Sequence, residues 1–505
     1  MAATVQQNLY QGDEKNSATI EGHIFEDSQN DSSASSIVDW TEEEERKIVR
    51  KLDCIVMPLL MLGFVALQLD RGNIGNTLTD NFLKDVGITQ DQFNVGQQLM
   101  SLGIVLLEIP SNLILYRLGP SIWISSQIFA WGLVATFQSF QKGLSPYYVT
   151  RLFLGLCESG FIPAGLFTIT MWYKRDETSK RFAWFFIGNM GAQAATGLIA
   201  YGILHMRGVA GLTGWQWLFI LEGLFTILVS FILAALFPGV PSKAKSLLGV
   251  QYFSDRELHI IRQRVLLDDP TKATGRSNIT RKELTSTLSD WRIYPHLLMT
   301  ICALAPSGVF WSYAPTLVHS FGYPALKSNA LVSVGGWVLL VTNVSAGWIA
   351  DRVKRRGPVV LGFVIIWWAF ALGNLILAVT NSTNKTGRYA LLTLAIGFGS
   401  PWHAVNGSWL ALNARSPGER SIRMAMFIMS ANCSGIVGSQ LFQAKDAPKY
   451  HTGWTVIVCL ISTAIIFVSF NIIQYWISNK RIDAKNRGEI GFGENSEKNI
   501  RRYYT

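Results

Sequence analysis

Twelve long apolar runs constrain this chain more than any other feature of the sequence. Each run has about 20 mostly apolar residues, the length that an α-helix needs to cross a bilayer. A polar stretch, 238–292, separates six runs from the next six. The sequence therefore predicts an all-α membrane protein with twelve transmembrane helices in two six-helix halves, 51–237 and 293–478. The runs begin near Cys54, Phe93, Ile122, Tyr147, Phe182, Trp215, Ile293, Asn329, Val359, Tyr389, Met424 and Trp454.

Composition argues against the soluble classes. Charged residues make up 15% of the chain, whereas soluble proteins carry about 25%. The formal charge of +10 lies in short Lys/Arg clusters between the runs, such as 174–175, 180–181, 352–356 and 480–481. This pattern is typical of cytoplasmic loops and not of nucleic-acid-binding surfaces. The cysteines lack metal-ligand spacing and no phosphate-binding loop or catalytic motif occurs, so we expect neither cofactor nor metal, and no enzyme.

Loop charges predict an orientation. Residues 1–50 are polar and lack a signal-peptide pattern, so we expect a disordered cytosolic tail that ends in a charged, helix-prone stretch. The basic clusters then fall in cytosolic loops, as do the central loop, 238–292, and the C-terminal tail, 479–505. Glycosylation sequons at Asn381 and Asn384 fall on the outer side. We expect a multipass protein of the plasma membrane, monomeric, with both termini in the cytosol.

The loop after the eighth run reads GWIADRVKRRGP. It resembles the signature loop of the major facilitator superfamily, although Lys354 stands where a second glycine is usual. The resemblance implies a conformational latch at the cytoplasmic face. A plain basic loop is the alternative interpretation. The latch residues would be Gly347, Asp351, Arg352, Arg355 and Arg356.

Further segments resemble the anion:cation symporter family of this superfamily, and within it the fungal allantoate permease branch. They include LDRGNIGN (69–76), EIPSNLILYRLGP (108–120), RLFLGLCESGFIPAG (151–165) and SWLALNARSPGER (408–420). The resemblance covers about residues 50–480 and excludes both tails. It implies two halves that rock about a central site.

Charged residues inside the apolar runs are the main candidates for a site. Arg151 and Glu158 are seven residues apart and share one helix face. Ionised groups at this depth cost several kcal/mol unless they are paired or face a water-filled cavity. A static ion-pair network is one interpretation. The resemblance implies another, with Asp70 and Glu158 coupling protons and Arg71 and Arg151 recognising an anion.

Uncharged polar residues in the runs are candidates for lining the cavity. Asn189 and Gln193 lie one helical turn apart in the fifth run, and they either line a cavity or bond a neighbouring helix. Glu108 and Glu222 are interpreted as structural, paired with loop arginines. In the second half the lining candidates are His403, Asn406, Trp409 and Asn432.

Together these features predict proton-coupled uptake of a small organic anion, such as a carboxylate, a vitamin or a sulfur compound. An exporter of an endogenous metabolite would have the same fold and differ only in the direction of net flux. A sensor that binds solute without transporting it is a third possibility. Loss of the coupling carboxylates would indicate a sensor, but Asp70 and Glu158 are both present.

Overall fold

The computed structural model describes residues 39–241, 244–268, 281–380, 383–489 and 503. The chain divides into two units, 1–50 and 51–505. In the first unit, helix α2 (Glu42–Thr77) begins with four glutamates. Arg46 pairs with Glu42 and Lys47 with Glu43, both at 3.0 Å. These i,i+4 pairs confirm the helix predicted for this charged stretch.

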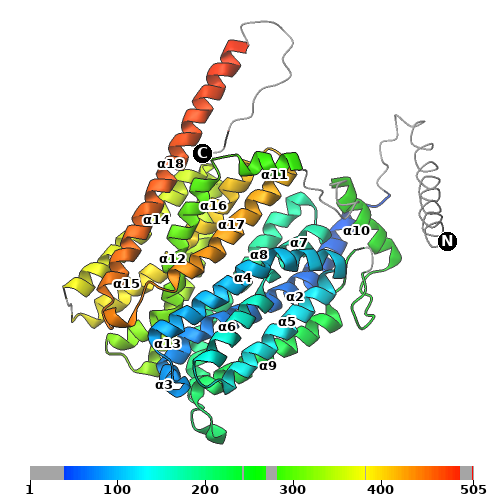
Figure 1. Ribbon diagram of the computed structural model, residues 1–505. Coiled ribbons are helices and arrows are strands. Elements are labelled where there is room, and N and C mark those ends of the chain that lie inside the picture. The colour runs from blue at the N-terminus through cyan, green and yellow to red at the C-terminus, as the bar shows by residue number, and fades with distance from the viewer. Residues whose placement is uncertain (1–38, 242–243, 269–280, 381–382, 490–502, 504–505) are drawn as a thin grey trace, which may run out of the picture. The chain divides into compact units, whose positions relative to one another are not determined.

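Helices occupy all twelve positions at which the sequence predicts a span (Figure 1). Seven helical stretches among the described residues are long and apolar enough to cross a membrane. In the first half the helices after α2 are α3 (Phe82–Val86), α4 (Gln90–Leu118), α5 (Pro120–Phe137), α6 (Leu144–Glu158), α7 (Phe161–Trp172), α8 (Arg175–Leu204) and α9 (Gly214–Leu236). In the second half they are α12 (Tyr294–Ser320), α13 (Ala325–Val353), α14 (Arg356–Val379), α15 (Lys385–Gly397), α16 (Pro401–Leu412), α17 (Pro417–Gly438) and α18 (His451–Glu489).

The fourth and tenth spans are broken, which corrects the prediction of two continuous runs. Between α6 and α7 the chain turns at Gly160, whose φ of +83° is a left-handed conformation that favours glycine. Between α15 and α16 the break covers 398–400, and Pro401 begins the next helix. The two breaks interrupt corresponding spans of the two halves. In transporters built from repeats, paired discontinuous helices of this kind mark the substrate site.

The helices pack against one another within each half, and the two halves also contact each other. α5 lies against α9 and α4 against α6, while α12 packs on α17 and α18. The halves meet where α4 contacts α17 and where α8 contacts α13. At the second contact Gly197 lies so close to the Asn329 carbonyl oxygen that no Cβ atom would fit. Small residues permit such approaches between membrane helices.

The central segment contains two short helices, α10 (Asp255–Asp268) and α11 (Arg281–Leu288). The stretch DRELHIIRQRVLLD forms α10, and RKELTSTL forms α11. Two ion pairs hold α10: Arg264 contacts Glu177 at 2.6 Å and Lys51 contacts Glu257 at 2.9 Å.

At the other end of the chain, Tyr503 docks on α18, a helix that extends past the predicted boundary at residue 478. The Tyr503 backbone N–H donates to Asn479 Oδ1 at 2.8 Å, and Asn479 Nδ2 donates to the Tyr503 carbonyl at 2.9 Å. The Tyr503 ring lies 5.4 Å from that of Tyr475. Arg415 donates to the Tyr503 hydroxyl at 3.3 Å. One residue of the tail therefore bonds both α18 and the loop between α16 and α17.

Candidate functional site

An ion pair between Arg71 and Glu158 lies beside the break in the fourth span. Arg71 Nε donates to Glu158 Oε2 at 2.6 Å. The Glu158 side chain is fully buried, whereas 23% of the Arg71 side chain is exposed. Glu158 Oε1 has no hydrogen-bond partner among the described residues. The arrangement leaves part of an arginine accessible while its carboxylate partner is enclosed.

Asp70 adjoins this pair but has different partners. Trp131 Nε1 and Thr226 Oγ1 both donate to Asp70 Oδ2 at 3.0 Å. The charge of Glu158 acts on Asp70, so the two carboxylates are electrostatic neighbours. Two acids near one partly exposed arginine form a group that can change its charge when a ligand or a proton arrives.

Arg151 does not lie where a substrate could touch it in this conformation. Its side chain is fully buried and donates to Gln138 Oε1. The guanidinium carbon lies 5.8 Å from the centre of the Tyr147 ring and 6.0 Å from that of Phe219. Direct anion recognition by Arg151 therefore lacks support, because its surroundings are protein on every side. Its charge still acts on Glu158 and Asp70.

Glu108 and Glu222 lie in the same region, contrary to the expectation that they pair with loop arginines. Glu108 Oε2 accepts a hydrogen bond from Asn432 Nδ2 at 2.8 Å, and the charge of Arg71 acts on Glu108. The buried Glu222 has the Asn73 side chain as its polar neighbour, and the charge of Asp70 acts on it. Acidic residues inside apolar runs are the sequence pattern that indicates a place in the charged site for Glu108 and Glu222.

The predicted amide pair of the fifth span contacts the first span. Gln193 Nε2 donates to Asn189 Oδ1 at 3.3 Å, and Gln68 of α2 donates to the same oxygen. Asn189 and Gln193 are half-buried. The structure thus places them in a bond between helices, and cavity lining stays a prediction.

The second-half candidates separate into two groups. Asn406 and Trp409 are fully buried and face the interior of that half. The Asn406 side chain lies 2.7 Å from His296 Nδ1, and the Trp409 and His296 rings are 4.7 Å apart. A substrate cannot reach either residue in this conformation, so the structure does not support a lining role. His296 was missed because a single histidine in an apolar run carries no spacing signal.

His403 and Asn432 are the half-buried members of the set. His403 stacks on Phe427, with ring centres 4.6 Å apart, and its Nε2 has no partner among the described residues. Asn432 reaches across to Glu108 of the first half. Of the four candidates, Asn432 is the one that bonds to the charged group among the residues that the structure describes.

The predicted latch residues contact their own half. Arg356 lies 3.4 Å from Asp351 and donates to Ser408 of α16 at 3.0 Å. The Arg352 guanidinium lies 5.2 Å from the Trp348 ring. Asp351 is 80% exposed. A latch between the halves therefore remains a prediction about another conformation.

Of the two sequons, Asn381 lies outside the described residues. Asn384 caps helix α15, because its Oδ1 accepts from the Gly387 N–H at 2.9 Å. Glycosylation at either position stays a prediction.

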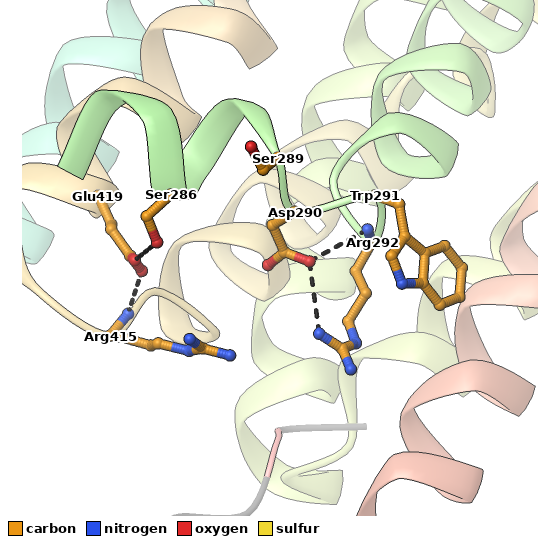
Figure 2. A pocket seen from close by; sticks show the side chains of 7 residues that line it. All are labelled: Ser286, Ser289, Asp290, Trp291, Arg292, Arg415 and Glu419. Atoms are coloured by element: carbon orange, nitrogen blue, oxygen red, sulfur yellow. Dashed lines mark hydrogen bonds and ion pairs between the residues drawn. The ribbon is translucent and has the colours of Figure 1, made fainter. Parts of the chain in front are cut away.

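A separate cavity of about 290 Å³ lies where α11 leads into α12. Figure 2 shows Asp290 paired with Arg292 and Glu419 bonded to Ser286 and Arg415. Arg423 also contacts Asp290, at 2.8 Å. The acidic and basic side chains pair with one another, and none belongs to the predicted site. The cavity is lined by Ser286, Ser289, Asp290, Trp291, Arg292, Arg415 and Glu419.

Known proteins with similar sequences are named as transporters. A curated relative, an uncharacterized transporter of Saccharomyces cerevisiae, is 29% identical over 86% of this chain and 82% of its own length. The MFS-type transporter cnsO of Penicillium expansum is 28% identical over 91% of this chain and 87% of its own.

Solved structures share the fold at low identity. The partially occluded inward-open xylose transporter XylE from E. coli matches with a TM-score of 0.62 and 13% identity, over 82% of this chain and 96% of that one. An inward-facing bacterial homologue of the human lysosomal transporter Spinster matches with a TM-score of 0.62 and 13% identity, over 86% and 97%.

The helical fold and the relatives together define a multipass membrane transporter. The family model described as Major Facilitator Superfamily matches residues 60–439, and this chain belongs to that superfamily.

Proposed function

We propose that this transporter takes up a small organic anion together with a proton, as a member of the allantoate permease branch of the anion:cation symporters. The observation that carries the proposal is the 2.6 Å ion pair between the partly exposed Arg71 and the fully buried Glu158. A planar guanidinium matches a carboxylate or sulfonate in bidentate fashion, and so suits Arg71 to bind such an anion.

Anion binding and protonation are coupled through competition for Arg71. A substrate anion that engages the guanidinium weakens its bond to Glu158. An ionised carboxylate left without a partner in an apolar interior costs several kcal/mol. Glu158 therefore takes up a proton as the anion binds, and by linkage a proton on Glu158 strengthens anion binding.

Asp70 serves as the second proton-coupling group in this proposal. Its hydrogen bonds from Trp131 and Thr226 fix the carboxylate beside Glu158, where the charge of one acid acts on the other. Protons enter from the outer side, the two halves rock, and both ligands leave into the cytosol, where protons are scarcer. Arg151 contributes positive charge from behind the site without touching substrate.

The test is uptake of radiolabelled small acids into cells that express the protein, at external pH 5 and pH 7. We expect uptake of at least one acid to be several-fold faster at pH 5. Glu158→Gln should abolish this pH dependence, and Arg71→Ala should abolish saturable uptake. Arg481→Lys, at an exposed position of α18, is the control that should behave as the unchanged protein.

Two results would contradict the proposal in different ways. Uptake that ignores pH in the unchanged protein excludes proton symport. Uptake that survives Arg71→Ala with unchanged affinity excludes the anion-binding role of Arg71. Net efflux of a preloaded acid, with no uptake, would instead favour the exporter.

A further inference from the structure

A seam of polar contacts runs along one side of α4 and joins it to α17 and the residues after α17. The contacting positions of α4 are spaced by four, three and seven residues, so they share one helix face. They are, in order along α4, Asn94 with the Phe442 carbonyl at 2.8 Å, Gln98 with the Ile436 carbonyl at 3.0 Å, Ser101 against Gly435, and Glu108 with Asn432 at 2.8 Å.

Glu108 differs from the other seam residues because it is ionisable and belongs also to the charged site. It is 6% exposed, and the charge of Arg71 acts on it. The Cys433 thiol is its titratable neighbour on α17. One carboxylate thus interacts with the proposed anion-binding arginine of the first half and with an amide of the second half.

We propose that Glu108 couples occupancy of the Arg71 site to the contact between the two halves. This inference rests on the proposed anion-binding role of Arg71. Burial disfavours the ionised form of Glu108, whereas the positive charge of Arg71 favours it. An ionised carboxylate accepts a stronger hydrogen bond from Asn432 than a neutral acid does. An anion on Arg71 offsets that charge, weakens the Glu108–Asn432 bond and makes the seam easier to open.

Glu108 and Asn432 are therefore positioning residues that act through Arg71 and need not touch the substrate. By linkage, a weaker bond between Glu108 and Asn432 also shifts the population of conformations in the absence of substrate. The coupling can thus be measured without knowing the substrate.

The experiment measures opening of the seam by labelling a cysteine within it. Ser101→Cys is placed in a background in which the five native cysteines are replaced. Ser101 lies seven residues beyond Asn94, about 10 Å deeper along α4. A membrane-impermeant maleimide, applied at the side where α2 ends and α4 begins, reaches this thiol when the seam opens.

Five variants, two single, two double and one triple, give the expected pattern. Glu108→Gln keeps a hydrogen-bond acceptor but loses the negative charge, and Asn432→Ala removes the donor. Each change should make labelling of the Ser101→Cys thiol about fivefold faster, which corresponds to the difference between a charged and a neutral hydrogen bond. The two changes together should have no larger effect than one of them. Arg71→Met with Glu158→Gln, which leaves no orphan charge, should also speed labelling, but not in the Glu108→Gln background.

The control is Asn374→Ala, a buried asparagine whose amide donates to the Phe370 carbonyl of its own helix at 2.9 Å. Labelling should not change, and gel filtration in detergent should show every variant folded. Suppose that Asn432→Ala speeds labelling while Arg71→Met with Glu158→Gln does not. The Glu108–Asn432 bond then holds the seam closed independently of Arg71, and the inference is overturned. If neither change alters the labelling rate, the Glu108–Asn432 bond does not hold the seam closed at all. Both outcomes are independent of the uptake assay.

Discussion

At the scale of single residues, Arg71 interacts with two acids, Glu158 and Glu108, and follows a third, Asp70, in the chain. It contacts Glu158 directly, and its charge acts on Glu108. Asp70 instead accepts hydrogen bonds from Trp131 and Thr226. The geometry of the guanidinium, and not its charge alone, therefore decides how a substrate and Glu158 compete for it.

Arg71→Lys keeps the positive charge and removes the planar fork. Because a lysine ammonium binds as a point charge, we expect the apparent KM for the anion to rise about tenfold while the maximal rate changes less. The measurement is the concentration dependence of initial uptake at pH 5. An unchanged KM would mean that the fork geometry is not used.

The contact of α10 with α8 rests on one buried residue. The Arg264 side chain is fully buried and contacts Glu177 through both its terminal nitrogens, at 2.6 and 3.1 Å. Glu177→Gln removes the compensating charge, so we expect destabilisation of about 3 kcal/mol. Thermal unfolding in detergent should show a melting temperature several degrees lower. Glu42→Gln, at an exposed surface pair, should leave the melting temperature unchanged.

A second pair on α10 matters for the pH comparison. Partial burial raises the pKa of Glu257, but hydrogen bonds from Lys51 and Ser254 outweigh it and hold that pKa below its usual range. A carboxyl with a lowered pKa stabilises the fold above its unfolded pKa, about 4.3, and loses this contribution as the pH falls through the folded value. Glu257 therefore keeps its negative charge at both pH 5 and pH 7, and a difference in uptake between these two values does not come from this carboxyl.

At the scale of elements, the break between α6 and α7 places Glu158 at the end of a helix. Gly160 has a left-handed φ of +83°, and a Cβ atom there would collide with the Ser111 side chain. The break also orients the second part of the span, so that both halves of the molecule carry a discontinuous helix at corresponding positions.

Gly160→Ala should lower stability for two separable reasons. The backbone strain costs about 1 kcal/mol, and the collision with Ser111 adds to it. Ser111→Gly removes the collision but also the bonds that Ser111 accepts from Trp123 and Gln127. Gly160→Ala should therefore cost less in a Ser111→Gly chain than in the unchanged chain, and the strain should remain. Gly191→Ala, where a Cβ atom meets open space, should not lower the melting temperature. If Gly160→Ala leaves the melting temperature unchanged, the break between α6 and α7 does not require glycine at this position.

The sequence predicts where the helices lie better than it predicts which residues contact one another. Apolar runs predict the helix positions because burial in lipid demands continuous apolar length, and paired charges predict the start of α2. Asn406 and Trp409 lie on the predicted helix but face inward, since periodicity in an apolar run does not distinguish cavity, lipid and core. The break at 398–400 carries no pattern beyond one glycine and a proline. Glu108 could be recognised as buried, but its partner Asn432 lies 324 positions away.

At the scale of the whole molecule, the described contacts between the halves lie mainly toward the end where α2 ends. Asn94 and Gln98 of α4 meet the chain around α17 there, and Asn329 Nδ2 donates to Thr79 Oγ1 at 2.8 Å. This arrangement is one conformation of the transporter, and in the proposed cycle the two halves separate at this end in another conformation. The proposed coupling makes that separation hardest when Arg71 holds no anion.

Return of the unloaded carrier should then be the slow step of the cycle. Cells preloaded with unlabelled substrate should take up labelled substrate faster than empty cells, by several-fold in initial rate. Glu108→Gln should reduce this stimulation, because it eases return of the empty carrier. Equal rates in preloaded and empty cells would place the slow step elsewhere.

The docking of Tyr503 has a practical consequence for work on this protein. A purification tag or fluorescent protein added after Thr505 begins within three residues of Tyr503. Its bulk would compete with the contacts to Asn479, Tyr475 and Arg415. Reporters are therefore better joined to the N-terminus, and melting temperatures from C-terminally tagged protein should be compared with an N-terminally tagged counterpart.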